Sequence, residues 1–221
     1  MELQEYQTLI KRIKTHGARL VAVSKTKPEA DIMALYQFGQ RAFGENRVQE
    51  LTEKQANLPD DIEWHMIGHL QTNKVKYIAP FVHLIHSVDS FKVLKAVNKE
   101  AQKNERVIDC LLQIKIAEED TKYGFDDSSL REMLKSEVFT KLHHIRICGV
   151  MGMATFTDNE QQVRREFQQL KRHFQQLQTE YFTDQKYFKE ISMGMSGDYE
   201  WALEEGSTIV RIGSLLFGAR T

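Results

Sequence analysis

A lysine ends an apolar run near the start of the chain, in the segment Val23-Ser24-Lys25-Thr26-Lys27-Pro28. The preceding residues Leu20-Val21-Ala22 have the composition of a buried strand, so the chain presents an amine where that strand ends. Burial or a neighbouring cation favours the neutral form of such an amine, which is then nucleophilic toward an aldehyde. Lys27 projects from the same side and would act in this direction. The alternative is a strand-end lysine in solvent.

Two segments rich in small residues, 192–198 and 210–214, lie near the other end of the chain. They offer hydroxyl groups and approachable backbone N–H groups, which suit an anion such as phosphate. Asp198 would cap a helix running to Glu205, whose first N–H groups then face the same phosphate as the Ser196 hydroxyl. Each segment alone is ordinary turn chemistry. Combined with the lysine amine, they predict pyridoxal 5′-phosphate (PLP) held as a Schiff base.

Arg211 follows the apolar residues 208–210, and a guanidinium at the end of a buried strand requires an acceptor. One acceptor is the ring nitrogen of PLP. Because a guanidinium donates hydrogen bonds and has no lone pair to accept with, this contact would keep the ring nitrogen unprotonated and make the ring a weaker electron sink. The alternative is a salt bridge between Arg211 and a carboxylate on a neighbouring strand.

The histidines do not form a metal-binding pattern in the sequence. His65 and His69 have the i, i+4 spacing of a helical metal pair, but Gly68 and the extended character of the preceding residues oppose a helix there. His83 and His86 belong to an alternating strand and are interpreted as a surface and a core histidine. We therefore expect no metal.

Composition is that of an ordinary globular protein, with 221 residues, 41% hydrophobic and 28% charged, and we expect one domain over residues 1–221. The net charge of −1, without a single-sign block, argues against a nucleic-acid or membrane partner. Without a signal-peptide pattern or a long apolar run, a cytoplasmic location follows by default. Cys110 and Cys148 lie in apolar segments and are predicted to be buried free thiols.

Eight short apolar runs alternate with amphipathic stretches along the chain. The helical pattern is clearest over residues 159–178 and in the N-terminal residues 3–13. Strand–helix repetition implies a parallel sheet, and eight repeats favour a closed α/β barrel, the (β/α)8 TIM-type barrel, over an open doubly wound sheet. The N-terminal helix, which precedes the first strand, would fill the slot left by a missing last helix. The predicted strands are residues 18–24, 41–43, 63–67, 82–88, 107–116, 144–151, 189–193 and 208–212.

Barrels of this type carry their chemistry at the carboxyl ends of the strands. Segments far apart in the sequence would thus converge on one mouth. The residues at or just beyond the predicted strand ends are Lys25, Asn46, Gly68, His69, Met151, Met153, Ser192 to Ser196, and Arg211 to Ser214.

Five motifs, taken in order, resemble the YggS/PROSC family of pyridoxal phosphate homeostasis proteins over nearly the whole chain: AVSKTKP (22–28), FGEN (43–46), WHMIGHLQTNK (64–74), GMS (194–196) and VRIGSLLFG (210–218). The resemblance implies an alanine-racemase-like barrel of fold type III. It also implies a Schiff base on the lysine, a ring-nitrogen contact from the arginine, phosphate contacts and two pocket-lining positions. In this chain the resemblance assigns the Schiff base to Lys25 and the ring-nitrogen contact to Arg211. It assigns the phosphate contacts to Ser196, Gly213 and Ser214, and the pocket-lining positions to Asn46 and His69.

Two departures from the commonest family pattern are mild. Ser214 stands where the family often has Thr, and the Met-Gly-Met segment 151–153 stands where a Met-Ala or Met-Thr pair is usual. Lys122 matches a family loop lysine, which implies a role in cofactor exchange shared with Lys27. The alternative for Lys122 is a solvated loop charge.

The resemblance leaves two functional classes to weigh, a PLP carrier and an amino-acid racemase. Racemisation needs two bases on opposite faces of the substrate carbanion, and in alanine racemase the second is a tyrosine delivered across a dimer that involves an additional C-terminal domain. This chain ends at Thr221, soon after the last predicted strand, so we expect a non-catalytic, monomeric carrier that buffers PLP and delivers it to apo-enzymes. A third class, an interaction scaffold without ligand, leaves Lys25 and Arg211 unexplained.

Overall fold

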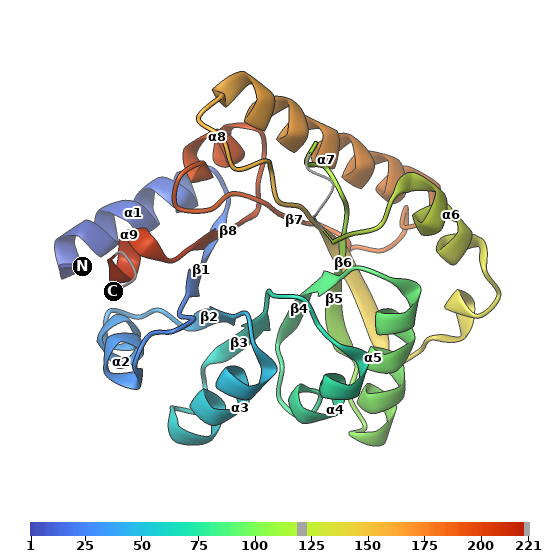
Figure 1. Ribbon diagram of the computed structural model, residues 1–221, viewed down its shortest axis with the longest axis horizontal. Coiled ribbons are helices and arrows are strands. Elements are labelled where there is room, and N and C mark those ends of the chain that lie inside the picture. Colours follow the sequence, from blue (N-terminus) through green and yellow to red (C-terminus); the bar gives the residue numbers. More distant parts are fainter. Residues whose placement is uncertain (119–122, 219–221) are drawn as a thin grey trace.

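Eight parallel strands close into a barrel in which each strand pairs with the next along the chain and β8 pairs with β1 (Figure 1). The computed structural model describes residues 1–118 and 123–218. The predicted (β/α)8 barrel is confirmed, and each predicted strand is present within a few residues of its expected bounds. The strands are β1 (Arg19–Val23), β2 (Ala42–Glu45), β3 (Glu63–Met66), β4 (Leu84–Val88), β5 (Ile108–Gln113), β6 (Ile145–Met151), β7 (Glu190–Ser192) and β8 (Ile209–Ile212).

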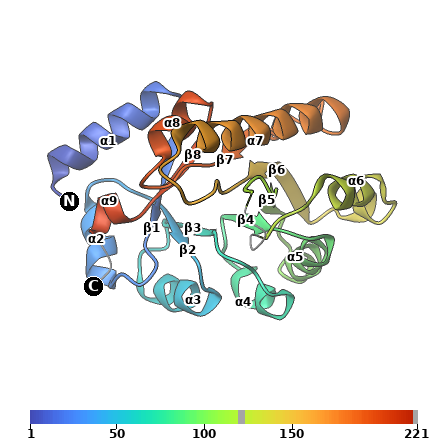
Figure 2. The same cartoon turned by 45° about the horizontal axis from the view of Figure 1, so that its top comes forward.

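Helices surround the strands on the outside of the barrel (Figure 2). The short α4 follows a 3-10 turn at Thr72–Lys74, and a second such turn, Phe139–Lys141, follows α6. The helices are α1 (Leu3–Thr15), α2 (Glu29–Gln37), α3 (Val48–Asn57), α4 (Val75–Ile78), α5 (Phe91–Lys103), α6 (Asp127–Lys135), α7 (Glu160–Glu180), α8 (Tyr199–Glu204) and α9 (Ser214–Phe217).

Helix α1 precedes β1, as predicted, and lies beside α8 in both views (Figures 1 and 2). Its Arg12 forms an ion pair with Glu200 on α8. On its other side, the Tyr6 hydroxyl donates to the Gln40 side chain at 2.9 Å, just after α2. Helix α1 therefore contacts α8 on one side and the segment after α2 on the other. These are the two neighbours of the place in the outer ring that the predicted barrel left without a helix.

Periodicity and capping explain why the longest helix forms where it does. The side chain of Asn159 accepts a hydrogen bond from the backbone of Gln162 and caps the first turn of α7. The apolar residues that recur along α7 at spacings of three and four are all buried against the barrel. These residues are Val163, Phe167, Leu170, Phe174 and Leu177.

The apolar core has two parts, because strands of a barrel alternate between an outer and an inner face. The larger part lies between the barrel wall and the helices. The smaller part fills the barrel interior with Val21, Ala42, Leu84, Leu111, Cys148, Met151 and Ile209. On β8, Ile209 faces inward and Val210 and Ile212 face outward, so Arg211, two residues after Ile209, is on the inner face.

The two cysteines are buried free thiols, as expected. Burial raises the pKa of the Cys110 thiol well above its ordinary value and raises that of Cys148 to about 12. Within the described ranges, no helix combines the length and apolar character needed to cross a membrane.

Candidate cofactor site at the carboxyl ends of the strands

Contacts between distant segments show which of the predicted site residues the barrel brings together. The backbone N–H of Gly213, after β8, donates to the hydroxyl of Ser196, after β7, at 3.2 Å. Gly213 also packs on the end of β1, since a Cβ atom there would lie 3.2 Å from the carbonyl oxygen of Val23. A Cβ atom on Gly68 would overlap the backbone of Asn46. The ends of β1, β7 and β8 therefore adjoin one another, and the segment after β2 contacts the segment after β3.

Lys25 is half-buried in the turn after β1, and both of its neighbours are fixed by hydrogen bonds. The backbone N–H of Ser24 donates to the carbonyl oxygen of Gly44 at 3.1 Å. The backbone N–H of Thr26 donates to the carboxylate of Glu50 at 2.6 Å, and Thr26 has a φ of 63°, which is rare for a branched residue. The turn that carries the Lys25 amine is thus held on both sides.

A buried polar network beneath this turn connects β2 and α3. The Nζ atom of Lys54 donates to the Ser24 carbonyl oxygen at 2.7 Å, to Glu45 Oε1 at 2.8 Å and to Glu50 Oε1 at 2.7 Å. The Ser24 hydroxyl donates to the same Glu45 oxygen at 2.6 Å. Burial raises the pKa of the Glu45 carboxyl, and the hydrogen bonds from Lys54 and Ser24 oppose that shift. The network ties the Lys25 turn to a helix through a buried ion pair.

Arg211 lies on β8 with its side chain buried inside the barrel. Its Nη1 atom donates to the hydroxyl of Ser192 at 2.6 Å, and its Nη2 atom donates to the carbonyl oxygen of Gly152 at 3.1 Å. Both partners are neutral, and among residues 1–118 and 123–218 no carboxylate pairs with the guanidinium. Burial lowers the pKa of Arg211 to about 10, against a small opposing effect of Asp198. The salt bridge considered as an alternative from the sequence is therefore not found in the described ranges.

Two buried histidines extend the polar contacts of Arg211 along the barrel interior. Nδ1 of His86 lies 2.9 Å from the Ser192 hydroxyl, and Nε2 of His86 lies 2.8 Å from Nδ1 of His65. Burial is the largest cause that lowers the pKa of both rings well below the ordinary value, so both are neutral at neutral pH. The hydrogen-bonded chain Arg211–Ser192–His86–His65 connects the carboxyl end of the barrel with its amino end.

The pocket positions predicted after β2 and β3 lie at the mouth. Asn46 is half-buried and follows β2 directly. His69 follows β3, and its Nδ1 atom lies 2.8 Å from the carboxylate of Asp89 after β4. The His69 ring stacks on Tyr123, with 4.2 Å between ring centroids. His69 thus connects the segments that follow β3, β4 and β5.

Three predicted site residues remain, Ser214, Lys27 and Lys122. Ser214 is exposed and begins α9. Lys27 is half-buried, and its Nζ atom donates to the carbonyl oxygen of Phe217 at 3.1 Å, which ties the Lys25 turn to α9. Lys122 lies outside the described residues.

The expectation that the Asp198 side chain caps a helix is wrong. Asp198 precedes α8, but its side chain makes no capping bond there, and its Oδ1 atom accepts from the backbone N–H of Met195. Asp198 therefore shapes the turn that contains Ser196.

Several residues of the site had not been assigned a role from the sequence. The sequence places Ser192 only within a small-residue segment. Strand alternation was the available signal, because it puts Ser192 and Arg211 on the inward faces of the neighbouring strands β7 and β8. Lys54 gave no signal, because a lysine in an amphipathic helix is ordinarily exposed. The buried position of Glu45 was likewise not visible in the sequence.

Comparisons with known proteins show which family this chain is similar to. Residues 3–221 match the family model described as alanine racemase, N-terminal domain. A protein of Aquifex aeolicus (strain VF5) named pyridoxal phosphate homeostasis protein is 43% identical over 204 residues, which cover 92% of this chain and 87% of the relative.

Solved structures of PipY from Synechococcus elongatus PCC7942 are also similar. The structure without PLP is 35% identical, has a TM-score of 0.90 and is matched over 99% of this chain and 100% of PipY. The structure with PLP bound is 34% identical, has a TM-score of 0.87 and is matched over 98% and 99% of the two chains.

The barrel and the family match together define a class, the (β/α)8 barrels of the alanine racemase N-terminal domain type. Within that class, the chain belongs to the family of pyridoxal phosphate homeostasis proteins.

Proposed function

We propose that this protein binds PLP at the carboxyl end of its barrel, with the cofactor held on Lys25 as a Schiff base, and that it buffers and delivers PLP. The observation that carries the proposal is that a lysine just after β1 and an arginine on β8 lie near the carboxyl ends of these two paired strands. Lys25 is half-buried in a fixed turn after β1, and Arg211 is buried on β8, where its partners within the described residues are the neutral groups of Ser192 and Gly152. The PLP-bound structure of the relative PipY supports the same ligand here.

The residues present fit the chemical groups of PLP. An aldehyde requires an amine, which Lys25 supplies. A phosphate requires N–H and O–H donors. The Ser196 hydroxyl and the backbone N–H of Ser214 are such donors near the same strand ends, and the Gly213 N–H, which donates to Ser196 in this structure, lies beside them. A pyridine nitrogen requires a donor, and the Arg211 guanidinium has N–H groups beyond the two that bind Ser192 and Gly152.

The chain's own residues favour binding over turnover. When bound, PLP supplies an aldehyde that condenses with amines and a ring that withdraws electrons. Arg211 only donates hydrogen bonds, so it would hold the ring nitrogen unprotonated and limit that withdrawal. A carrier needs no more than an amine, a phosphate site and an open mouth. We therefore propose a non-catalytic role.

The proposed carrier acts as a monomer, in the cytoplasm, and has apo-enzymes that depend on PLP as its partners. Lys27 would assist cofactor exchange from its position between the Lys25 turn and α9. Delivery requires an affinity for PLP that is weaker than the acceptor's.

A transfer assay tests the proposal. Protein loaded with PLP is freed of unbound cofactor and mixed with an apo-enzyme, and separately with L- or D-alanine, serine or threonine. We expect the apo-enzyme to regain activity and the amino acids to react no faster than with free PLP. Lys25→Ala, treated identically, should restore little activity because it retains little PLP.

Two results would contradict the carrier assignment. A stereospecific turnover of an amino acid that disappears in Lys25→Ala would assign the protein to the racemase class. Failure of the wild-type protein to retain any PLP would leave only the class of ligand-free scaffolds.

A further inference from the structure

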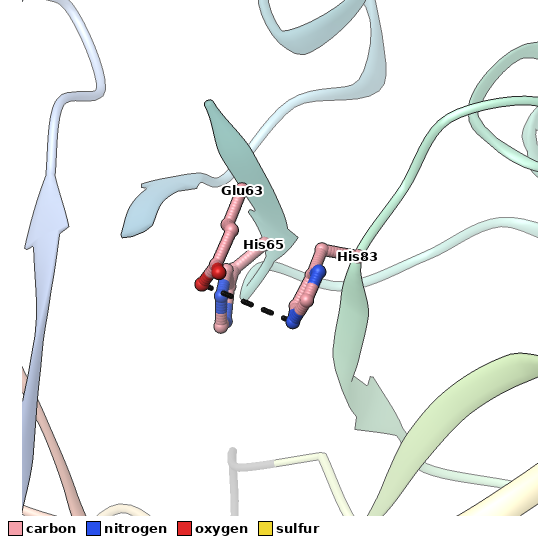
Figure 3. Close-up of side chains that lie close together, drawn as sticks. All are labelled: Glu63, His65 and His83. Atoms are coloured by element: carbon pink, nitrogen blue, oxygen red, sulfur yellow. Dashed lines mark ion pairs between the residues drawn. The ribbon is translucent and has the colours of Figure 1, made fainter. Parts of the chain in front are cut away.

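Three side chains with metal-ligating atoms, Glu63, His65 and His83, lie close together (Figure 3). They are at the amino end of the barrel, whereas the proposed PLP site is at the carboxyl end. Glu63 and His65 lie on β3, two residues apart and therefore on one face of the strand. His83 directly precedes β4, the strand that pairs with β3. One ligand atom from each of the three lies within 4.8 Å of the others, and Nε2 of His83 is 3.9 Å from the Glu63 carboxylate.

One member of this cluster, His65, has a buried ring nitrogen without a partner. The side chain of His65 is fully buried, and within the part of the chain that the structure describes its Nε2 atom has no hydrogen-bond partner. The other ring nitrogen is bonded to His86. Leaving a buried polar atom unpaired is unfavourable, so a partner for Nε2 is expected. The His65 ring also stacks on His83, with 5.4 Å between centroids, so the unpartnered ring lies against a second imidazole.

The hydrogen bonds behind His65 match those of a metal-bound histidine. If Nε2 offers its lone pair to a metal, Nδ1 carries the proton and donates to Nε2 of His86. Nδ1 of His86 then donates to the Ser192 hydroxyl oxygen. Ligating histidines generally donate their second N–H to a fixed acceptor in this way. The opposite direction of the chain would leave an N–H on Nε2 buried without an acceptor.

Access from solvent also suits an ion. The side chains of Glu63 and His83 are 44% and 45% exposed, so an ion can reach them from solvent and both can rotate toward it. A hollow lined by His83, Arg19 and Arg146 adjoins them. Both arginines are already paired with carboxylates, Arg19 with Glu190 at 3.2 Å and Arg146 with Asp109 at 2.7 Å.

We propose that Glu63, His65 and His83 bind one divalent transition-metal ion of the zinc type at the amino end of the barrel. Two imidazoles and a carboxylate are a common ligand set for Zn²⁺, with water in the remaining position. The ion joins the start of β3 to the start of β4. From the sequence we expected no metal, because His83 precedes the neighbouring strand β4 and does not follow His65 at helical spacing.

Cobalt and zinc titrations test the site. Tag-free protein should bind one Co²⁺ ion per chain, with the visible absorption bands of a four- or five-coordinate site. Zn²⁺ should displace the Co²⁺. His83→Gln should weaken Co²⁺ binding more than about tenfold, and Glu63→Gln by a similar factor. Both side chains are half-exposed, so these variants should fold. Nitrogen NMR should show that Zn²⁺ shifts the Nε2 signal of His65.

Controls separate this site from other histidines and from PLP, which itself binds metals. His143→Gln changes an exposed histidine elsewhere and should leave Co²⁺ affinity unchanged. Lys25→Ala should bind Co²⁺ with the same stoichiometry as wild type, which places the ion outside the proposed cofactor site. The proposal is wrong if no saturable binding occurs, if His83→Gln binds like wild type, or if binding requires Lys25.

Discussion

Lys25 and Arg211, which carry the proposed function, differ in how firmly the structure holds their side chains. Lys25 is only half-buried, and what is fixed around it is the backbone of its turn. Arg211 is buried and its guanidinium is fixed by Ser192 and Gly152. An amine that must bind and release a ligand benefits from exposure, whereas a contact that sets the electronics of a ring benefits from rigidity. The two residues are therefore suited to exchange and to ring control, respectively.

Arg211→Glu tests the ring contact. A carboxylate opposite the ring nitrogen would favour its protonation, which strengthens the electron sink and shifts the absorption of bound PLP. Loss of a charged hydrogen bond should also weaken PLP binding by about 10- to 100-fold. The measurement is an absorbance titration with PLP.

Arg211→Gln provides the matched variant, since its amide still donates hydrogen bonds and carries no charge. It should bind PLP more weakly than wild type without the spectral shift. Thermal unfolding of both variants establishes that they fold. An unchanged spectrum and affinity in Arg211→Glu would show that Arg211 does not contact the ring.

At the scale of elements, α3 positions the Lys25 turn. Lys54 on α3 pairs with the fully buried Glu45 at the end of β2 and also binds the carbonyl oxygen of Ser24. A buried ion pair contributes little net stability, but removing one partner leaves an uncompensated charge. The network therefore makes the position of the turn depend on the position of α3.

Lys54→Met should destabilise the protein by about 3–5 kcal/mol, because Glu45 is left buried and unpaired. Urea unfolding measures the change. In the double variant Lys54→Met, Glu45→Gln, most of the loss should be recovered. Lys99→Met, which changes an exposed lysine on α5, is the control. A Lys54→Met variant as stable as the control would show that the buried pair does not hold the turn.

The same elements show what a sequence pattern can and cannot predict. The barrel was predictable because buried strands require short apolar runs, and helices with one buried face, such as α7, require apolar residues at helical spacing. The mouth residues Lys25 and Arg211 were predictable because each ends or interrupts an apolar strand. The buried position of Lys54 was not predictable, because burial of a lysine on a helix depends on which strand the helix packs against. Asp198 was assigned the wrong partner because a turn and a helix cap use the same residue types.

At the scale of the whole molecule, the barrel separates two polar sites by its length. The proposed PLP site occupies the carboxyl ends of the strands, and the proposed metal site lies at the amino ends of β3 and β4. The buried chain from Arg211 to His65 runs between them. Closure of the sheet brings the ends of β1 and β8 together, although they are the first and last strands. That residues 1–221 form a single domain remains a prediction.

The central claim is that one lysine of the whole chain, Lys25, holds PLP covalently. Borohydride reduction of the PLP-loaded protein, followed by peptide mapping, compares every lysine in a single measurement. We predict a reduced pyridoxyl adduct on Lys25 alone, and its absence from Lys25→Ala at equal PLP concentration. An adduct on Lys27 or Lys122, or the same yield of adduct in Lys25→Ala, would contradict the account.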